Sequence, residues 1–142
     1  TSSGNGFYAS FGKGRPHTAY STAKFAVKGF TEALMEDLEV NAPHVRAAVV
    51  MPGHIGTQII TNSMHARAIE PTPEEAELQL LAAQQFETLA PMTGEEAATV
   101  ILDAVKAGTW RILVGADAHE LDEAVRADPE SAYERDLFRL LG

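Results

Sequence analysis

The feature that most constrains the fold is a long helix-forming stretch that leads directly into a short apolar segment. Between Thr18 and about Asn41 the apolar residues recur at steps of three and four, as on one face of a helix, at Ala23, Ala26, Val27, Phe30, Leu34 and Leu38. Asn41–Ala42–Pro43 ends this helix, because the residue before a proline avoids the helical region. The next segment, Val45–Met51, is mostly apolar and partly β-branched, and Pro52–Gly53 terminates it. Such a segment is typical of a strand buried on both faces of a parallel sheet.

Two further helix starts and a second strand continue this alternation. Thr72–Glu75 and Thr93–Glu96 are capping-box sequences, so we expect helices from Thr72 to about Leu89 and from Thr93 to near Gly108. Arg111–Val114 is a short apolar strand, and two short helices follow it, the second opened by Asp128–Pro129. Residues 4–17 are expected to form a loop, and residues 54–71 to be irregular. Strands joined by helical crossovers predict an α/β fold with a parallel sheet.

The composition excludes several classes of protein and of site. A length of 142 residues fits one domain, and a net charge of −9 argues against a nucleic-acid-binding surface. There is no cysteine for a disulfide or thiolate site, and the five histidines lie too far apart in sequence for a local metal motif. The histidine spacing therefore predicts no metal site. We see no signal peptide and no apolar run near the ~20 residues of a membrane helix, so we expect a cytoplasmic protein. The acidic residues after 116 are expected to form a solvated face.

Tyr20 and Lys24 form the pair of residues with the clearest chemical use. They stand four positions apart at the start of the predicted helix, which places both side chains on one helical face. A nearby ammonium and the positive end of a helix both stabilise a phenolate, so the pair can serve as a general acid and base. Taken alone, the same spacing also fits an interfacial tyrosine beside a solvated lysine.

The segments around this pair favour the acid and base interpretation over that of an interfacial tyrosine. TSSGNG stands upstream of AYSTAKFAVKGFTEAL, and VRAAVVMPGHIGTQI follows downstream. In this order the three segments resemble the short-chain dehydrogenase/reductase family. The resemblance rests on motifs over residues 1–60 and on the layout of helices and the last strand from there to residue 115. It implies a Rossmann-like, doubly wound parallel sheet, of which this sequence supplies the C-terminal part.

The resemblance also implies roles for three catalytic residues. Tyr20 would protonate the carbonyl oxygen during reduction, or take up the proton during alcohol oxidation. Lys24 would make the Tyr20 hydroxyl easier to deprotonate and would hold the nicotinamide ribose hydroxyls. Ser3 would hydrogen-bond the substrate oxygen and stabilise the charge that develops on it.

The implied cofactor is NAD or NADP, with the preference for the 2′-phosphate left open. Pro52 and Gly53 would border the nicotinamide pocket. Ile55 would present its backbone, and Thr57 its hydroxyl, to the carboxamide of the nicotinamide. The hydride belongs to the cofactor, and the protein supplies position and electrostatics.

The sequence departs from the family pattern in two respects. Ser3 stands 17 positions before Tyr20, farther than is usual in the family, and we interpret Phe11–Pro16 as a short insertion; Ser10 and Ser2 are rival candidates for the serine. The glycine-rich dinucleotide turn, the residue that selects NAD or NADP, the Asn-Asn-Ala-Gly segment and the catalytic asparagine are all absent from the sequence. We therefore expect residues 1–142 to be the C-terminal portion of a single domain whose dinucleotide-binding half lies outside it, inactive by itself.

These features predict an oxidoreductase that interconverts a carbonyl and a secondary alcohol of a small-molecule substrate. The alternative is a non-catalytic or inactive member that senses NAD(P) or serves as an assembly subunit. Neither nucleic acid nor membrane is an expected partner. A homodimer or homotetramer is expected through the helix after Tyr20 and the last strand, with Phe25, Val27 and Met35 facing a partner.

Residues 58–92 are expected to cover the substrate. The apolar residues that can line its pocket are Met64, Ile69, Leu78, Leu81, Phe86 and Met92, although Leu78 and Leu81 fit simple helix packing better. His54 adjoins the nicotinamide turn and can contact cofactor or substrate, but a loop histidine without a chemical role is the interpretation we favour.

Overall fold

Helices and short parallel strands alternate along the chain in the computed structural model, which describes residues 1–10, 12, 15, 17–66, 71–135 and 137. The order of elements is a 3₁₀ turn η1 (Gly4–Gly6), α1 (Thr18–Asn41), β1 (Val49–Pro52), β2 (Ile55–Gly56), α2 (Ile59–His65), α3 (Pro73–Thr88), β3 (Met92–Thr93), α4 (Gly94–Lys106), β4 (Arg111–Val114) and α5 (Ala116–Ala127). None of the described helices combines the length and the hydropathy needed to cross a membrane.

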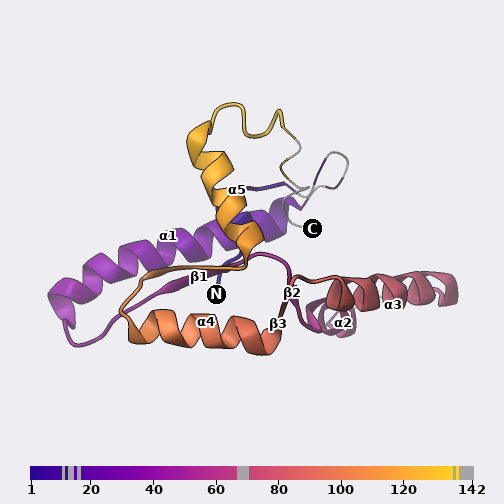
Figure 1. Cartoon of the computed structure of the whole chain (residues 1–142), viewed down its shortest axis with the longest axis horizontal. Coiled ribbons are helices and arrows are strands. Elements are labelled where there is room, and N and C mark those ends of the chain that lie inside the picture. The colour runs from indigo at the N-terminus through magenta and orange to yellow at the C-terminus, as the bar shows by residue number, and fades with distance from the viewer. Residues whose placement is uncertain (11, 13–14, 16, 67–70, 136, 138–142) are drawn as a thin grey trace.

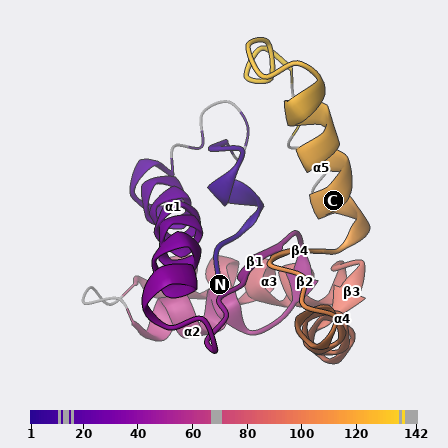
Figure 2. The same cartoon turned by 90° about the vertical axis from the view of Figure 1, so that its left-hand side faces the viewer.

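A small parallel sheet lies between helical layers. β1 pairs with β4 in parallel, with Met51 opposite Leu113. α1 packs against β1 and α4 against β4, and the two helices lie on opposite sides of the strands in Figures 1 and 2. A second parallel pair joins β2 to β3, with Ile55 opposite Met92. The arrangement is an α/β fold of the Rossmann-like type, as predicted.

The start of the chain runs along the other edge of β1. The backbone N–H of Ser2 donates to the carbonyl of Val50 over 2.7 Å, on the side of β1 away from β4. Three segments therefore end together at one edge of the sheet: residues 2–3, the end of β1 and the end of β4. In open parallel sheets, this carboxyl edge is where ligands bind.

Two apolar clusters hold these elements in place. The first surrounds the sheet and contains Val50, Ile55, Ala97, Ile112 and Val114. The second joins the segment after η1 to α5 and the turns that follow it, and contains Tyr8, Leu121, Ala132 and Leu137. Fully burying one side chain of this size contributes about 1.5–3 kcal/mol.

The predicted helix caps are present at atomic detail. Thr72 Oγ1 accepts from the Glu75 N–H over 3.3 Å, and a Glu75 carboxylate oxygen accepts from the Thr72 N–H over 2.9 Å. Thr93 and Glu96 make the same reciprocal pair over 3.2 and 2.9 Å. These bonds satisfy N–H groups that have no partner within the helix. The predictions of α1, α3, α4 and β4 are confirmed.

Three local predictions are wrong. The strand expected over Val45–Met51 begins only at Val49, because its partner β4 begins at Arg111, directly after the turn at Gly108–Trp110. Residues 54–71 were expected to be irregular but contain β2 and α2. The second short helix, expected from Asp128, is a set of turns over residues 129–134.

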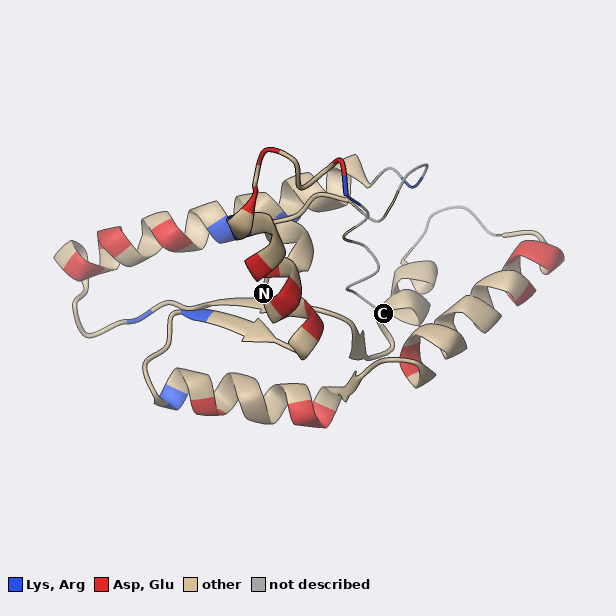
Figure 3. Cartoon of the chain, turned by 45° about the horizontal axis from the view of Figure 1, so that its top comes forward, with Lys and Arg blue, Asp and Glu red and all other residues tan. Residues whose placement is uncertain are grey.

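The acidic face expected after residue 116 is only partly solvated. Figure 3 shows Asp and Glu on the helices that surround the sheet, α5 included. Two of the α5 carboxylates are nevertheless buried, Asp117 at 8% exposure and Asp122 at 7%. Asp122 faces β4, where it accepts from Arg111 over 3.1 Å, and Arg126 also donates to it over 3.0 Å. The prediction was wrong for these two residues because α5 begins right at the end of β4 and turns one side into the core.

Candidate active site

A cavity of about 600 Å³ opens at the carboxyl edge of the sheet; we call it the strand-end cavity. The chain start, the first turns of α1 and the turn after β1 form one side, and α2, α3 and α4 complete it. All seven residues singled out from the sequence line this cavity, namely Ser3, Tyr20, Lys24, Pro52, Gly53, Ile55 and Thr57. The fold thus brings together segments more than fifty positions apart in sequence.

Tyr20 and Lys24 share the face of α1 that borders the cavity. Lys24 Nζ lies 5.4 Å from the centroid of the Tyr20 ring. The same ammonium donates to the Thr1 carbonyl over 3.4 Å, which ties α1 to the chain start. Both side chains are half-buried, so they are accessible to a molecule in the cavity.

The three candidate serines occupy different environments. Ser3 Oγ accepts from the Asn5 N–H over 3.2 Å, which engages a lone pair and leaves the hydroxyl proton for a donor role. Ser2 is 3% exposed and donates its hydroxyl proton to the Lys24 carbonyl over 2.7 Å. Ser10 lies along a different depression, beside Ala9 and Phe25. Of the three, Ser3 combines a place in the strand-end cavity with a hydroxyl suited to donate into it.

The turn after β1 is fixed by backbone contacts. The Gly53 N–H donates to the Val114 carbonyl over 2.9 Å, which continues the pairing of β1 with β4. A Cβ atom at Gly53 would lie 2.2 Å from the Asp117 carboxylate, so this close approach requires glycine. The His54 N–H donates to Asp117 Oδ2 over 2.5 Å. Asp117 of α5 therefore holds the turn whose residues are predicted to border the nicotinamide.

Apolar side chains form the wall of the cavity opposite the turn. Met64 and Phe86 line it, as expected from the sequence. Leu78 and Leu81 are exposed on α3, at 68% and 49%, and Met92 packs against the sheet cluster. Ile69 lies outside the described residues. Sequence reasoning missed several lining residues because they come from the unexpected α2 and from the inner face of α4: Ile59, Ile60, Ser63, Ala97, Ala98 and Ile101.

Comparisons with known proteins agree with this architecture. The family model described as short chain dehydrogenase matches residues 1–68. Two curated relatives, both named "Putative oxidoreductase SadH" and coming from Mycobacterium tuberculosis strains CDC 1551 / Oshkosh and ATCC 25618 / H37Rv, are each 36% identical over 119 residues. Residues 1–68 are thus similar to the short-chain dehydrogenases, as the motifs of the sequence imply.

The match to these relatives covers 83% of the chain and 40% of each relative. The chain therefore spans about two fifths of the length of the curated relatives that it matches. No solved structure matches it. The family match over residues 1–68 includes the whole of the Ser3, Tyr20, Lys24 and Pro52–Thr57 set.

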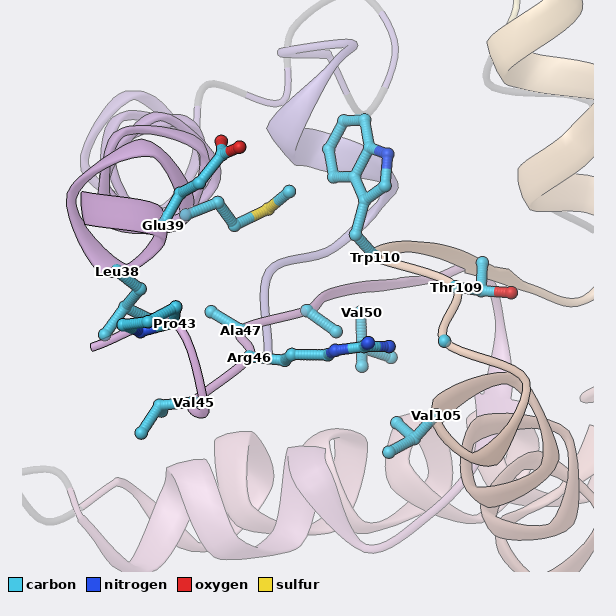
Figure 4. Close-up of a pocket in the computed structure, with 13 residues that line it drawn as sticks. Leu38, Glu39, Pro43, Val45, Arg46, Ala47, Val50, Val105, Thr109 and Trp110 are labelled. Carbon is cyan, nitrogen blue, oxygen red and sulfur yellow. The ribbon is translucent and has the colours of Figure 1, made fainter. Parts of the chain in front are cut away.

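A second cavity, of about 700 Å³, lies at the other end of β1 (Figure 4). α1 contributes Met35 and Leu38 to its lining, the segment before β1 contributes Val45 and Ala47, and Trp110 precedes β4. None of the seven predicted catalytic and cofactor-binding residues is among its lining residues. The chemistry predicted from the sequence is therefore confined to the strand-end cavity.

Proposed function

We propose that the protein is an NAD(P)(H)-dependent oxidoreductase that interconverts a carbonyl and a secondary alcohol, with Tyr20 as general acid and base. The observation that carries this proposal is the shared lining of one cavity by Ser3, Tyr20 and Lys24 in a chain similar to the short-chain dehydrogenases. The name of its curated relatives, an oxidoreductase, agrees with the reaction class.

Each of the three side chains has a part in the proton transfer. In reduction, the Tyr20 hydroxyl donates its proton to the carbonyl oxygen while the carbonyl carbon gains a hydride, so the C=O π bond is replaced by C–H and O–H bonds. The Lys24 ammonium, 5.4 Å from the Tyr20 ring, stabilises the phenolate that remains. Ser3 donates its hydroxyl proton to the substrate oxygen as negative charge develops there. Alcohol oxidation runs through the same contacts in reverse.

The residues around the turn fit a nicotinamide cofactor. When bound, the nicotinamide supplies or accepts the hydride. Lys24 offers an ammonium for ribose hydroxyls, and Thr57 offers a hydroxyl to a carboxamide. Pro52 and Gly53 line the same cavity, and Gly53 has no side chain to fill the space that a flat ring would need. The donor set and the space therefore both support the assignment.

The cavity lining favours an apolar substrate of small or medium size. α2 and α3 contribute Ile60, Met64 and Phe86, and α4 contributes Ile101. No Asp or Glu occurs among the described lining residues, and the charged side chain there is that of Lys24, already assigned to the cofactor and Tyr20. A ketone or secondary alcohol with aliphatic or aromatic substituents suits such walls.

Replacement of the Tyr20 hydroxyl tests the proposal. In the full-length protein, Tyr20→Phe should lower kcat by about 10²–10⁴-fold, the usual contribution of a positioned acid and base, and leave cofactor affinity unchanged. Tyr133→Phe is the matched control, because Tyr133 is 53% exposed and lies outside the cavity. Steady-state kinetics with a panel of apolar ketones and a fluorescence titration of NADH or NADPH provide the two measurements. Equal turnover by Tyr20→Phe and wild type would contradict the mechanism.

A further inference from the structure

His54 connects two parts of the site without lining the cavity itself. Its Nε2 lies 2.7 Å from the Phe86 carbonyl oxygen. Its ring packs against the Phe86 ring, with the centroids 4.2 Å apart. A carbonyl oxygen accepts only, so Nε2 carries the hydrogen of this bond. His54 therefore donates from the turn after β1 to the end of α3.

The hydrogen bond from His54 reaches the C-terminal end of α3, where backbone carbonyls need donors from outside the helix. Phe86 is in the last turn of α3, which ends at Thr88, and the carbonyls at the C-terminus of a helix lack the backbone donors that a further turn would supply. A histidine that donates to such a carbonyl stabilises the end of the helix. Another contact lies beside it, because a Cβ atom at Gly56 would stand 2.8 Å from the Glu87 carbonyl oxygen. The C-terminal end of α3 therefore packs against residues 54–56.

Asp117 fixes the other side of His54. Its carboxylate accepts from the His54 N–H and is 8% exposed. It lies between two glycines, since a Cβ atom at Gly53 or at Gly115 would approach it to 2.2 or 2.3 Å. His54 is consequently held by its backbone to α5 and by its ring to α3.

α3 has few other attachments. Among its residues only Ala83 is buried, and Leu78, Leu80 and Leu81 are exposed. Figure 1 shows α2 and α3 together at one end of the molecule, beyond the ends of the strands. The same helix nevertheless turns Gln79, Ala82 and Phe86 toward the strand-end cavity. The position of this wall depends strongly on the few contacts at the end of α3.

We propose that His54 is a specificity-determining positioning residue, held by Asp117, which sets the distance between the α3 wall and the turn that borders the nicotinamide. This inference rests on the proposed function, because it assigns the substrate side of the same cavity. His54 transfers no proton in the reaction. It acts through Phe86 on the fit of the substrate, so its loss affects substrate binding rather than the chemical step.

Two substitutions separate the hydrogen bond from the bulk of the ring. His54→Gln keeps an N–H donor near the Nε2 position, whereas His54→Leu keeps the volume and removes the donor. In the full-length protein, His54→Leu should raise the KM for an apolar ketone about tenfold, the scale of one hydrogen bond, with unchanged kcat and cofactor affinity. His54→Gln should restore KM to near the wild-type value. The exposed His44 gives the matched control, His44→Leu, with wild-type kinetics.

Hydrogen exchange gives a readout that needs no turnover. In His54→Leu the amides of residues 85–90 should exchange about tenfold faster than in the wild type, and in His54→Gln at nearly the wild-type rate. Asp117→Leu should act like His54→Leu, while Asp117→Asn retains an acceptor and should act like His54→Gln. This second pair keeps the test decisive where one leucine variant fails to fold.

The possible outcomes separate the two proposals. A wild-type protein that turns over none of the ketones with either cofactor contradicts the proposed function, and the exchange measurement then decides the role of His54. Unchanged exchange in both leucine variants contradicts this inference, whatever the turnover. Equal KM values for His54→Leu and His54→Gln in an active enzyme also overturn it.

Discussion

The two sides of the strand-end cavity are built in different ways. The strand-end wall, which consists of Ser3, Tyr20, Lys24 and the Pro52–Gly53 turn, stands on the buried ends of the sheet, where Met51 and Val114 are fully buried. The helical wall, which consists of α2 and α3, has no buried side chain other than Ala83 among its described residues. The first wall carries every residue assigned to chemistry, and the second carries apolar contacts.

This difference matches what the proposed reaction would require of each wall. Proton and hydride transfer depend on positions held within fractions of an ångström, which only a well-packed support provides. Substrate binding tolerates, and often needs, a part of low local stability. We therefore expect changes in the strand-end wall to alter kcat and changes in the helical wall to alter KM.

Loss of the Ser3 hydroxyl should have the largest effect in this comparison. Ser3→Ala removes a donor from the developing oxyanion, so kcat should fall by about 10²–10³-fold. Ser2→Ala should instead lower the free energy of unfolding by about 1 kcal/mol, because it removes a hydrogen bond to the α1 backbone. Steady-state kinetics and urea unfolding of both variants measure these effects. A larger fall in kcat for Ser2→Ala would transfer the catalytic role to that neighbour.

The helices that could be predicted from the sequence are those with a stop or cap residue at an end. Pro43 ends α1, and Thr72 and Thr93 open α3 and α4 with side chains that bond their own helices. The spacing of Tyr20 and Lys24 likewise places both side chains on one helical face, and Ser3, expected from the family resemblance, lines the same cavity. Such signals act within a few residues, so the sequence alone displays them.

The elements that were missed depend on contacts distant in sequence. β2 and β3 are two residues long and exist because Ile55 meets Met92, 37 positions away. Asp117 stands in an acidic, helix-forming stretch that resembles a solvated face, and only the approach of Gly53 makes it a buried acceptor. The link from Asp117 through His54 to α3 therefore becomes visible only in three dimensions.

The attachment of α5 to the start of β4 should be sensitive to acid. Burial alone would raise the pKa of Asp122, but hydrogen bonds and charge from Arg111 and Arg126 hold it below its usual value near 3.8. A depressed pKa means that this stabilisation is complete above pH 4 and is lost as the pH falls below that value. Asp122→Asn should cost about 2–3 kcal/mol at pH 7, less than a fully buried pair because Arg126 is exposed.

Guanidinium unfolding of wild type and Asp122→Asn at pH 7 and pH 3 measures this contribution. The difference between the two proteins should shrink at pH 3, because the Asp122 carboxylate of the unfolded chain, with its usual pKa near 3.8, is then largely protonated. The exposed Asp103, which pairs with Lys106 on α4, provides the control, and Asp103→Asn should change stability by less than 1 kcal/mol at either pH. An equal difference at the two pH values would contradict a lowered pKa of Asp122 in the folded protein.

The smallest effect is expected at the N-terminal cap of α3, one of the two helices of the helical wall. Thr72→Ala and Thr93→Ala remove the same capping bond from α3 and from α4, at a cost of about 1 kcal/mol each. α4 packs on the sheet, so Thr93→Ala should lower the melting temperature of the whole protein. α3 is mostly exposed, so Thr72→Ala should leave the melting temperature nearly unchanged, raise substrate KM a few-fold and leave kcat as it is. Equal shifts in melting temperature would mean that α3 unfolds together with the sheet. The two walls would then form one cooperative unfolding unit.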